Sequence, residues 1–207
     1  MCCRSNEGVQ EFNIKFMTTN FENDVTASLA ALRTGGLILY PTDTIWGIGC
    51  DATDEAAVKK VFALKQRPEK KSLVILLADV KDLLKYVAHP DPAIADLIAS
   101  FDRPTTVIYE GALGLAPSVI NEDGTVAIRL VQDPFCRHLV KRLRKPLVST
   151  SANLSGQPSP AFYAGIDPAV KNGVDYVVSY RQEDNTPRQP SRIVKLLKDG
   201  TLQIIRD

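Results

Sequence analysis

The sequence lacks the residues and runs that several large protein classes need. No apolar stretch approaches the roughly 20 residues that span a bilayer, and Met1–Glu7 has no apolar signal-peptide core. The four cysteines show neither the spacing of a metal site nor a disulfide framework; they are Cys2, Cys3, Cys50 and Cys136. We therefore expect a cytoplasmic protein with no membrane segment and no metal held by protein side chains.

Motifs of the commonest catalytic classes are also missing. The chain holds neither a GxxxxGK[ST] phosphate-binding loop nor a GxGxxG dinucleotide fingerprint. Its two histidines, His89 and His138, are not paired with a nucleophile motif. Catalysis by such a chain has to rest on positioning and on stabilisation of charge, which suffices for phosphoryl and nucleotidyl transfer.

What is present fits one ordinary folded domain, because 207 residues with 44% hydrophobic side chains can bury a sizeable core. The formal net charge of +1 hides three basic blocks. Residues 58–71 hold six basic side chains against one acidic, 137–145 hold five against none, and 188–207 hold five against two. The blocks either meet as a cationic pocket in an otherwise acidic protein or form separate solvated faces.

Helical patterns alternate with short apolar strands along the chain. Asn23 or Asp24 is expected to cap the first helix, which Gly35-Gly36 ends. Further helices are expected over 55–65, 79–87, 91–100 (with Pro92 in its first turn) and 134–143. Expected strands cover 37–40, 73–77, 105–110, 125–130, 146–150, 175–179, 193–197 and 202–205. This order predicts a single α/β domain over 13–207 with a mixed sheet, whose antiparallel element is the terminal hairpin around Asp199-Gly200. Residues 1–12 are expected to form a flexible extension, and 182–190 a surface loop.

Polar residues gather where two of the expected strands end. Pro41–Gly47 follows a buried strand; its hydroxyls suit a small polar substrate and Trp46 can wall a pocket, although a plain turn before a core tryptophan would look the same. Ser149–Gly156 places four hydroxyls and an amide after an apolar strand. Such a stretch can donate to phosphate or carboxylate oxygens, or can merely cap a turn.

Two further features are cationic. Lys65–Lys71 clusters cations that suit a polyphosphate, but cations at a helix C-terminus also favour the helix dipole. Arg129 stands in an apolar strand and needs a partner if it points inward, either a ligand carboxylate or a local Asp or Glu. Gln189–Arg192 leads into the last hairpin.

These four features, in their order along the chain, resemble the YrdC/Sua5 family of threonylcarbamoyl-AMP synthases, from about Thr26 to Val194. The resemblance rests on Pro-Thr-Asp-Thr-Ile-Trp-Gly, a KxR motif at Lys65 and Arg67, the strand bearing Arg129, and an SxN motif at Ser151 and Asn153. It implies a twisted mixed sheet flanked by helices, with a concave basic cavity of the YrdC/RibB-like kind. It also implies that L-threonine, bicarbonate and ATP, with Mg2+ held by the ATP phosphates, give threonylcarbamoyl-AMP and pyrophosphate. The product would serve a downstream threonylcarbamoyl-transferase complex that makes the t6A modification of tRNA.

The resemblance also implies roles for particular residues. The threonine-binding set is Thr44, Arg129, Ser149 and Ser191, and the ATP-binding set is Arg67, Lys71, Thr125, Ser151 and Ser159. The catalytic set is the KxR and SxN residues Lys65, Arg67, Ser151 and Asn153.

The chain departs from the family pattern at three places. Phe101-Asp102-Arg103-Pro104 replaces a Trp-Pro-Gly-Pro-type turn, Pro190-Ser191-Arg192 replaces Pro-Ser-Thr, and Leu76 stands where some members carry histidine. Two alternatives therefore stay open: a YciO-like protein, and a non-catalytic module that binds double-stranded RNA or tRNA through the same basic cavity.

Overall fold

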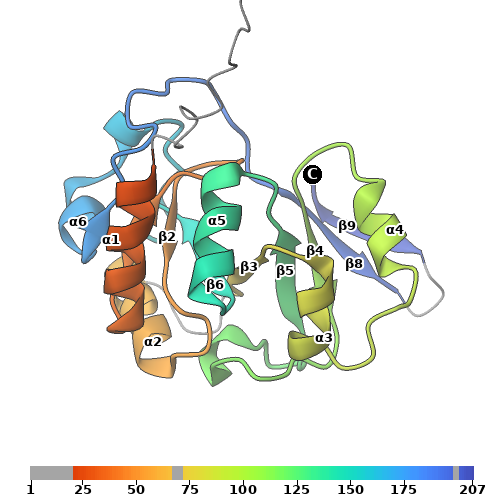
Figure 1. Ribbon diagram of the computed structural model, residues 1–207. Coiled ribbons are helices and arrows are strands. Elements are labelled where there is room, and N and C mark those ends of the chain that lie inside the picture. The colour runs from red at the N-terminus through yellow and green to blue at the C-terminus, as the bar shows by residue number, and fades with distance from the viewer. Residues whose placement is uncertain (1–20, 67–71, 198–200) are drawn as a thin grey trace, which may run out of the picture.

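A twisted sheet of nine strands lies at the centre of the computed structural model, which describes residues 21–66, 72–197 and 201–207 (Figure 1). The strands are β1 (Ile38–Tyr40), β2 (Gly47–Gly49), β3 (Val74–Leu77), β4 (Thr105–Tyr109), β5 (Val126–Leu130), β6 (Leu147–Ser151), β7 (Tyr176–Val177), β8 (Arg192–Leu196) and β9 (Leu202–Arg206). Their order in the sheet is β7-β1-β2-β6-β3-β5-β4-β8-β9. The expected extension over 1–12 and the turn at Asp199-Gly200 lie outside the described residues.

The sheet is mixed, as predicted, but antiparallel pairing is not confined to the terminal hairpin. Strands β1 and β7, β3 and β5, and β4 and β8 are parallel. The other five pairs are antiparallel. The expectation was wrong because the stretch between β1 and β2 contains no crossover helix, and a short connection returns the chain antiparallel to itself.

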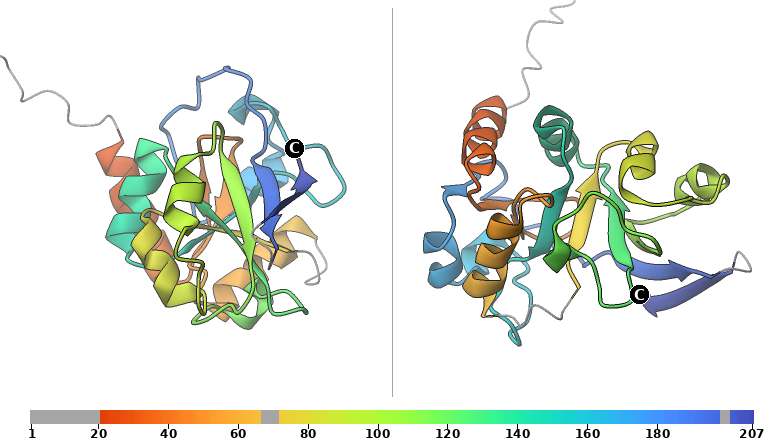
Figure 2. Two further views of the ribbon diagram at one scale, coloured as in Figure 1. Left: turned by 90° about the vertical axis from the view of Figure 1, so that its right-hand side faces the viewer. Right: turned by 90° about the horizontal axis from the view of Figure 1, so that it is seen from below.

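Helices flank the sheet. They are α1 (Glu22–Arg33), α2 (Glu55–Lys65), α3 (Leu83–Tyr86), α4 (Ile94–Ala99), α5 (Pro134–Leu143) and α6 (Pro168–Asn172), with single 3-10 turns η2 (Val80–Asp82), η3 (Pro117–Val119) and η4 (Tyr163–Gly165). Figure 1 shows α1 and α5 side by side across the sheet, and the turned views of Figure 2 keep them adjacent. None of the helices in the described part of the chain is long and apolar enough to cross a membrane.

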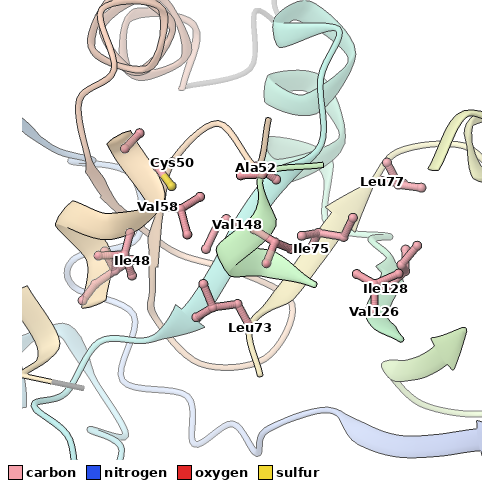
Figure 3. Close-up of a cluster of buried hydrophobic side chains, with 14 of the residues drawn as sticks. Ile48, Cys50, Ala52, Val58, Leu73, Ile75, Leu77, Val126, Ile128 and Val148 are labelled. Carbon is pink, nitrogen blue, oxygen red and sulfur yellow. The ribbon is translucent and has the colours of Figure 1, made fainter. Parts of the chain in front are cut away.

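Alternation along the strands divides the buried side chains into two clusters. Figure 3 shows the first, in which Ile48, Ile75, Ile128 and Val148 from four strands meet Val58 from α2. Each is at most 2% exposed, and burying such a side chain stabilises the fold by roughly 1.5–3 kcal/mol. This cluster therefore holds α2 against the strands that carry the candidate site.

The second cluster lies on the opposite face of the sheet. Tyr40, Leu76 and Leu147 from three strands pack there with residues of α1 and α5, among them Leu29 and Leu139. Since residues two apart in a strand share a face, the next positions along β3 and β6 point to the same side. Val74 and Ser149 occupy those positions and line a cavity.

Most predicted elements are confirmed, and their ends show the local causes. Helix α5 spans the expected residues 134–143, because the Asp133 side chain accepts a hydrogen bond from the Cys136 N–H (2.9 Å) and Pro134 fits the first turn. Helix α2 begins as expected after Asp54, whose carboxylate accepts from the Ala56 and Ala57 N–H groups.

Several boundaries differ from expectation. Asn23 and Asp24 lie inside α1 and cap nothing, since the residue that precedes the helix is Phe21. The helix expected over 79–87 is broken into η2 and α3, and α4 begins at Ile94, so that Pro92 precedes it. Strand β2 and helix α6 were not predicted.

Candidate functional site

An open cavity of about 280 Å3 is formed by residues of β2, β3, β5, β6, β8 and β9 and of the neighbouring loops. It is lined by Thr44, Ile45, Trp46, Gly47, Ser72, Val74, Arg129, Ser149, Thr150, Ser151, Ser159, Pro190, Ser191, Ile193 and Arg206. The described lining therefore combines many hydroxyl groups with two arginines and contains no carboxylate. Such a lining favours an anionic ligand.

Arg129 reaches this cavity from β5. It is 3% exposed, and its Nη1 donates to the Thr44 hydroxyl (2.9 Å) while its Nη2 lies 3.3 Å from the carboxylate of Asp43. Its Nε–H is buried and has no hydrogen-bond partner among the described residues. The sequence left a ligand and a local acid as alternative partners; the structure provides the acid and still leaves one donor unused.

Ser149 and Ser151 extend β6 into the cavity, opposite β2. A Cβ atom on Gly47 would lie 3.4 Å from the Ser149 Oγ and 3.3 Å from the Thr150 carbonyl oxygen. The absence of a side chain at Gly47 therefore leaves the space in front of Ser149 open. Gly47 of β2 is therefore part of the site.

The terminal hairpin closes another side of the cavity. The Ser191 hydroxyl lies 2.8 Å from that of Thr106, and Arg206 donates to the Ser191 carbonyl from Nε (3.2 Å) and Nη2 (2.7 Å). Burial, together with the nearby charge of Arg129, lowers the pKa of Arg206. Sequence reasoning missed Arg206, although it stands in an apolar strand just as Arg129 does, and that was the available signal.

Lys65 and Asn153 lie behind the cavity rather than in its lining. Lys65 is 2% exposed, and its Nζ donates to the carbonyl oxygens of Ser151 and of Asn153 (2.6 Å for the latter). The Asn153 side chain donates to the carbonyl of Gln157 (2.6 Å), and the Ser155 N–H donates to the carbonyl of Lys65 (2.8 Å). These two motif residues thus fix the loop that follows β6.

The structure brings together six of the predicted site residues: Thr44, Arg129, Ser149, Ser151, Ser159 and Ser191 all line the cavity. Trp46 also lines it, as predicted, and packs against Tyr163 with ring centroids 5.0 Å apart. Thr125 does not line it, because its hydroxyl donates to Asp123 (2.6 Å) in the turn before β5. Arg67 and Lys71 lie outside the described residues.

The basic blocks do not all meet at this cavity. The block over 188–207 supplies Arg206, and Lys65 of the block over 58–71 lies behind the lining, but no residue of 137–145 takes part. In the described part of the chain no three His, Cys, Asp or Glu side chains cluster as metal ligands would. The described lining therefore supplies hydrogen-bond donors and positive charge for anionic groups.

The fold and site define an α/β protein with an open, hydroxyl- and arginine-lined cavity at the end of its central strands. The chain belongs to the Sua5/YciO/YrdC family, whose family model, described as "telomere recombination", matches residues 30–207.

Curated relatives support this membership. The chain is 35% identical over 185 residues to the threonylcarbamoyl-AMP synthase of Stenotrophomonas maltophilia, covering 88% of this chain and 98% of that protein. It is 36% identical over 188 residues to the protein of the same name from Xanthomonas euvesicatoria, covering 89% and 97%.

Solved structures share the fold. P. abyssi Sua5 in complex with L-threonine matches with a TM-score of 0.76 at 23% identity, over 88% of this chain and 53% of that one. The chain thus spans about half the length of that Sua5. E. coli YciO matches with a TM-score of 0.76 at 21% identity, over 89% of both chains. At these identities the likeness concerns the fold, and the implied YrdC-like architecture is confirmed.

Proposed function

We propose that this protein is an L-threonylcarbamoyladenylate synthase, a nucleotidyltransferase that forms threonylcarbamoyl-AMP and pyrophosphate from L-threonine, bicarbonate and ATP. The observation that carries the proposal is the cavity, which gathers hydroxyl donors and two arginines from segments far apart in the chain. Two relatives that align with this chain over nearly their whole length are named threonylcarbamoyl-AMP synthase.

The residues divide by what they can donate. Arg129, Thr44, Ser149 and Ser191 form one group, in which the unused Nε–H of Arg129 supplies the counter-charge for the carboxylate of threonine. Ser151 and Ser159 are the members of the group proposed for ATP that line the cavity. Arg67 and Lys71 are proposed to complete the group, whereas Thr125 lies outside the lining. Arg206 adds a cation to the lining.

The reaction needs two steps. The amine of threonine attacks the carbon of bicarbonate, and loss of water leaves a carbamate. A carbamate oxygen then attacks the α-phosphorus of ATP, the bond to the β-phosphate oxygen breaks, and pyrophosphate leaves with its electron pair. A carbamate is a weak nucleophile, so most of the acceleration has to come from alignment of the two substrates and from donors that stabilise charge on the pyrophosphate.

Mg2+ fits this site as a partner of the ATP phosphates. The described lining provides hydroxyl groups and no carboxylates, so phosphate oxygens and water would supply the ligands of the ion. When bound, Mg2+ neutralises phosphate charge. The hydroxyl groups and arginines of the chain orient the phosphates around it.

The proposed cellular location and downstream partner of the protein follow from the reaction. We propose a cytoplasmic location, because tRNA and ATP are found there. The product is proposed to pass to a threonylcarbamoyl-transferase complex that completes t6A.

The direct test is pyrophosphate release by the purified protein. We expect release that requires ATP, bicarbonate and L-threonine together. No release is expected when threonine is replaced by its analogue that lacks the amine. No threonine-dependent pyrophosphate at saturating substrates would contradict the synthase and leave the YciO-like alternative.

Substitution of Arg129 tests whether this residue binds threonine. Arg129→Lys keeps the charge but removes the Nε–H together with the two Nη groups that contact Thr44 and Asp43. Loss of the charge-assisted hydrogen bond to threonine, about 1.5–3 kcal/mol, should raise KM for threonine by roughly tenfold to a hundredfold. Arg192→Lys is the matched control, because Arg192 pairs with Asp207 (2.8 Å) outside the cavity. Equal KM values for the two variants would refute the assignment of Arg129.

A further inference from the structure

Two threonines of the turn after β1 lie one behind the other at the candidate active site. Thr44 lines the cavity and is 5% exposed, whereas Thr42 is 2% exposed and lies outside the described lining. Their hydroxyl oxygens are 2.9 Å apart. The function proposed above uses Thr44 and gives no role to Thr42.

One arrangement of hydroxyl hydrogens satisfies all the contacts of this pair. A threonine hydroxyl has one hydrogen to donate and two lone pairs that accept. The Thr42 hydroxyl donates its hydrogen to the Ile45 carbonyl (2.8 Å) and accepts from the Thr44 N–H (3.0 Å). The hydrogen between the two hydroxyl groups therefore comes from Thr44, because the reverse arrangement would take the Thr42 donor away from the Ile45 carbonyl.

Thr44 is consequently an acceptor toward the cavity. Its hydrogen is directed at Thr42, and one of its lone pairs accepts from Nη1 of Arg129 (2.9 Å). The second lone pair remains for a ligand. Carboxylate and phosphate oxygens carry no hydrogen and cannot donate to it. On threonine, the groups that can donate are the amine and the hydroxyl.

The surrounding protein holds Thr42 in this orientation. Nη2 of Arg181 donates to the Thr42 carbonyl (3.3 Å) and to the Asp133 carboxylate (2.7 Å). The Asp133 side chain also accepts from the Cys136 N–H and so caps α5. The backbone of Thr42 is thereby tied to an ion pair and to a helix end, so the direction of the hydrogen bond from Thr44 is set by the fold.

We propose that Thr44 accepts an N–H of the substrate amine and that Thr42 is the positioning residue that keeps Thr44 an acceptor. The inference rests on the function proposed above. The carboxylate of Asp43, which precedes Thr44 in the chain and lies 3.3 Å from Nη2 of Arg129, favours a positively charged ammonium over a neutral hydroxyl in this part of the cavity.

An acceptor at Thr44 suits the first step of the reaction. The ammonium group of threonine gives one proton to solvent, and the resulting amine attacks the carbon of bicarbonate with its lone pair. A hydroxyl that donated to this nitrogen would occupy the lone pair and weaken the nucleophile. A hydroxyl that accepts an N–H orients the nitrogen and leaves the lone pair free for the attack.

The test compares threonine with two analogues in calorimetric titrations of the full chain. 3-Hydroxybutanoate is threonine without its amine, and 2-aminobutanoate is threonine without its hydroxyl group. We expect the wild-type protein to bind threonine roughly tenfold to a hundredfold more tightly than 3-hydroxybutanoate, which is the effect of one hydrogen bond to a charged group. Loss of the hydroxyl group in 2-aminobutanoate should weaken binding less.

Variants of Thr42 test its positioning role. Thr42→Val releases the Thr44 hydrogen, which can then point at the ligand, so the preference for threonine over 3-hydroxybutanoate should shrink by about tenfold. Thr42→Ser retains the hydroxyl and should retain the preference. Thr53→Val is the matched control, because the Thr53 hydroxyl donates to Asp51 (2.7 Å) in another turn, outside the described lining. This control should keep the wild-type preference.

Two outcomes overturn the proposal. Equal weakening of threonine and 3-hydroxybutanoate in Thr42→Val would show that Thr42 only holds the turn. Weaker binding of 2-aminobutanoate than of 3-hydroxybutanoate by the wild-type protein would assign the Thr44 lone pair to the hydroxyl group of threonine, and this comparison needs no variant to fold. Pyrophosphate release is measured on the same samples. A wild-type protein that binds threonine without releasing pyrophosphate refutes the synthase alone, and one that binds no threonine refutes both proposals.

Discussion

Replacing Lys65 by methionine tests whether this motif lysine acts by holding a loop. Its Nζ donates to the carbonyls of Ser151 and Asn153, and the side chain is 2% exposed. Hydrogen bonds to charged groups contribute about 1.5–3 kcal/mol each, but the Ser151 carbonyl keeps a second donor in the Asn153 N–H (2.9 Å). Methionine also retains the apolar burial of the lysine stem. We therefore expect a loss of about 2–4 kcal/mol in the free energy of unfolding.

Urea unfolding with a common m-value measures the loss, and for a chain of this size it should lower the midpoint of thermal unfolding by roughly 5–12 °C. The control is Lys59→Met on the same helix, where the lysine side chain is 55% exposed and its pair with Glu55 (3.3 Å) is worth at most about 1 kcal/mol. If Lys65→Met and Lys59→Met unfold at the same urea concentration, Lys65 does not hold the loop. A direct contact between Lys65 and the substrate would then have to explain why the KxR motif contains this lysine.

The remaining predictions concern packing and pH. Gly49→Ala should lose about 2–3 kcal/mol of stability in urea unfolding, because the new Cβ would lie 2.7 Å from the ring of Tyr40; Gly165→Ala, with its nearest neighbour at 3.7 Å, should change little. Burial, aided by the hydrogen bond to Asp24 (2.6 Å), raises the pKa of Tyr176 from 10.0 to about 12. The phenol's contribution to stability is therefore complete below pH 10 and lost as pH rises from about 10 to 12. Burial also raises the pKa values of Tyr40, Tyr86 and Tyr109, so absorbance titration should show several late tyrosines. The component that is lost in Tyr176→Phe should titrate near 12, and Asp24→Asn should lower that pKa.

Helix α5 shows what local sequence can specify. Its cap at Asp133, the proline that follows and the apolar spacing over 135–143 all act within one segment, and the predicted ends agree with the structure. Asp24 shows the opposite case. It looks like a helix cap, but its carboxylate accepts hydrogen bonds from the Tyr176 hydroxyl and from the N–H groups of Ser179 and Tyr180. Partners more than 150 residues away decide its role.

Strand β2 could not be predicted for a similar reason. Gly-Ile-Gly has low strand propensity and spans three residues, so nothing local identifies it. It is a strand because the buried ring of Tyr40 lies against Gly49, where any side chain would collide with that ring and with the Val148 carbonyl. That fit exists only after β1, β2 and β6 have paired.

The site was predictable where a side chain type was itself informative. An arginine in an apolar strand needs a partner wherever it occurs, and both Arg129 and Arg206 line the cavity. Lys65 was predicted from its charge to face a phosphate, but a lysine can also be satisfied by backbone carbonyls, and sequence does not record which carbonyls fold back toward it.

The two arginines of the lining explain how a nearly neutral chain can form a cationic cavity. Lys65 donates to the carbonyl groups of Ser151 and Asn153 just behind the lining. Arg129 has one carboxylate, Asp43, while Arg206 lies close enough for its pKa to be lowered by the charge of Arg129. Arg129 and Arg206 therefore repel each other until an anion enters. Because the fold carries that repulsion in the free state, binding of an anion relieves it, and a polyanion such as ATP gains more than a single carboxylate would.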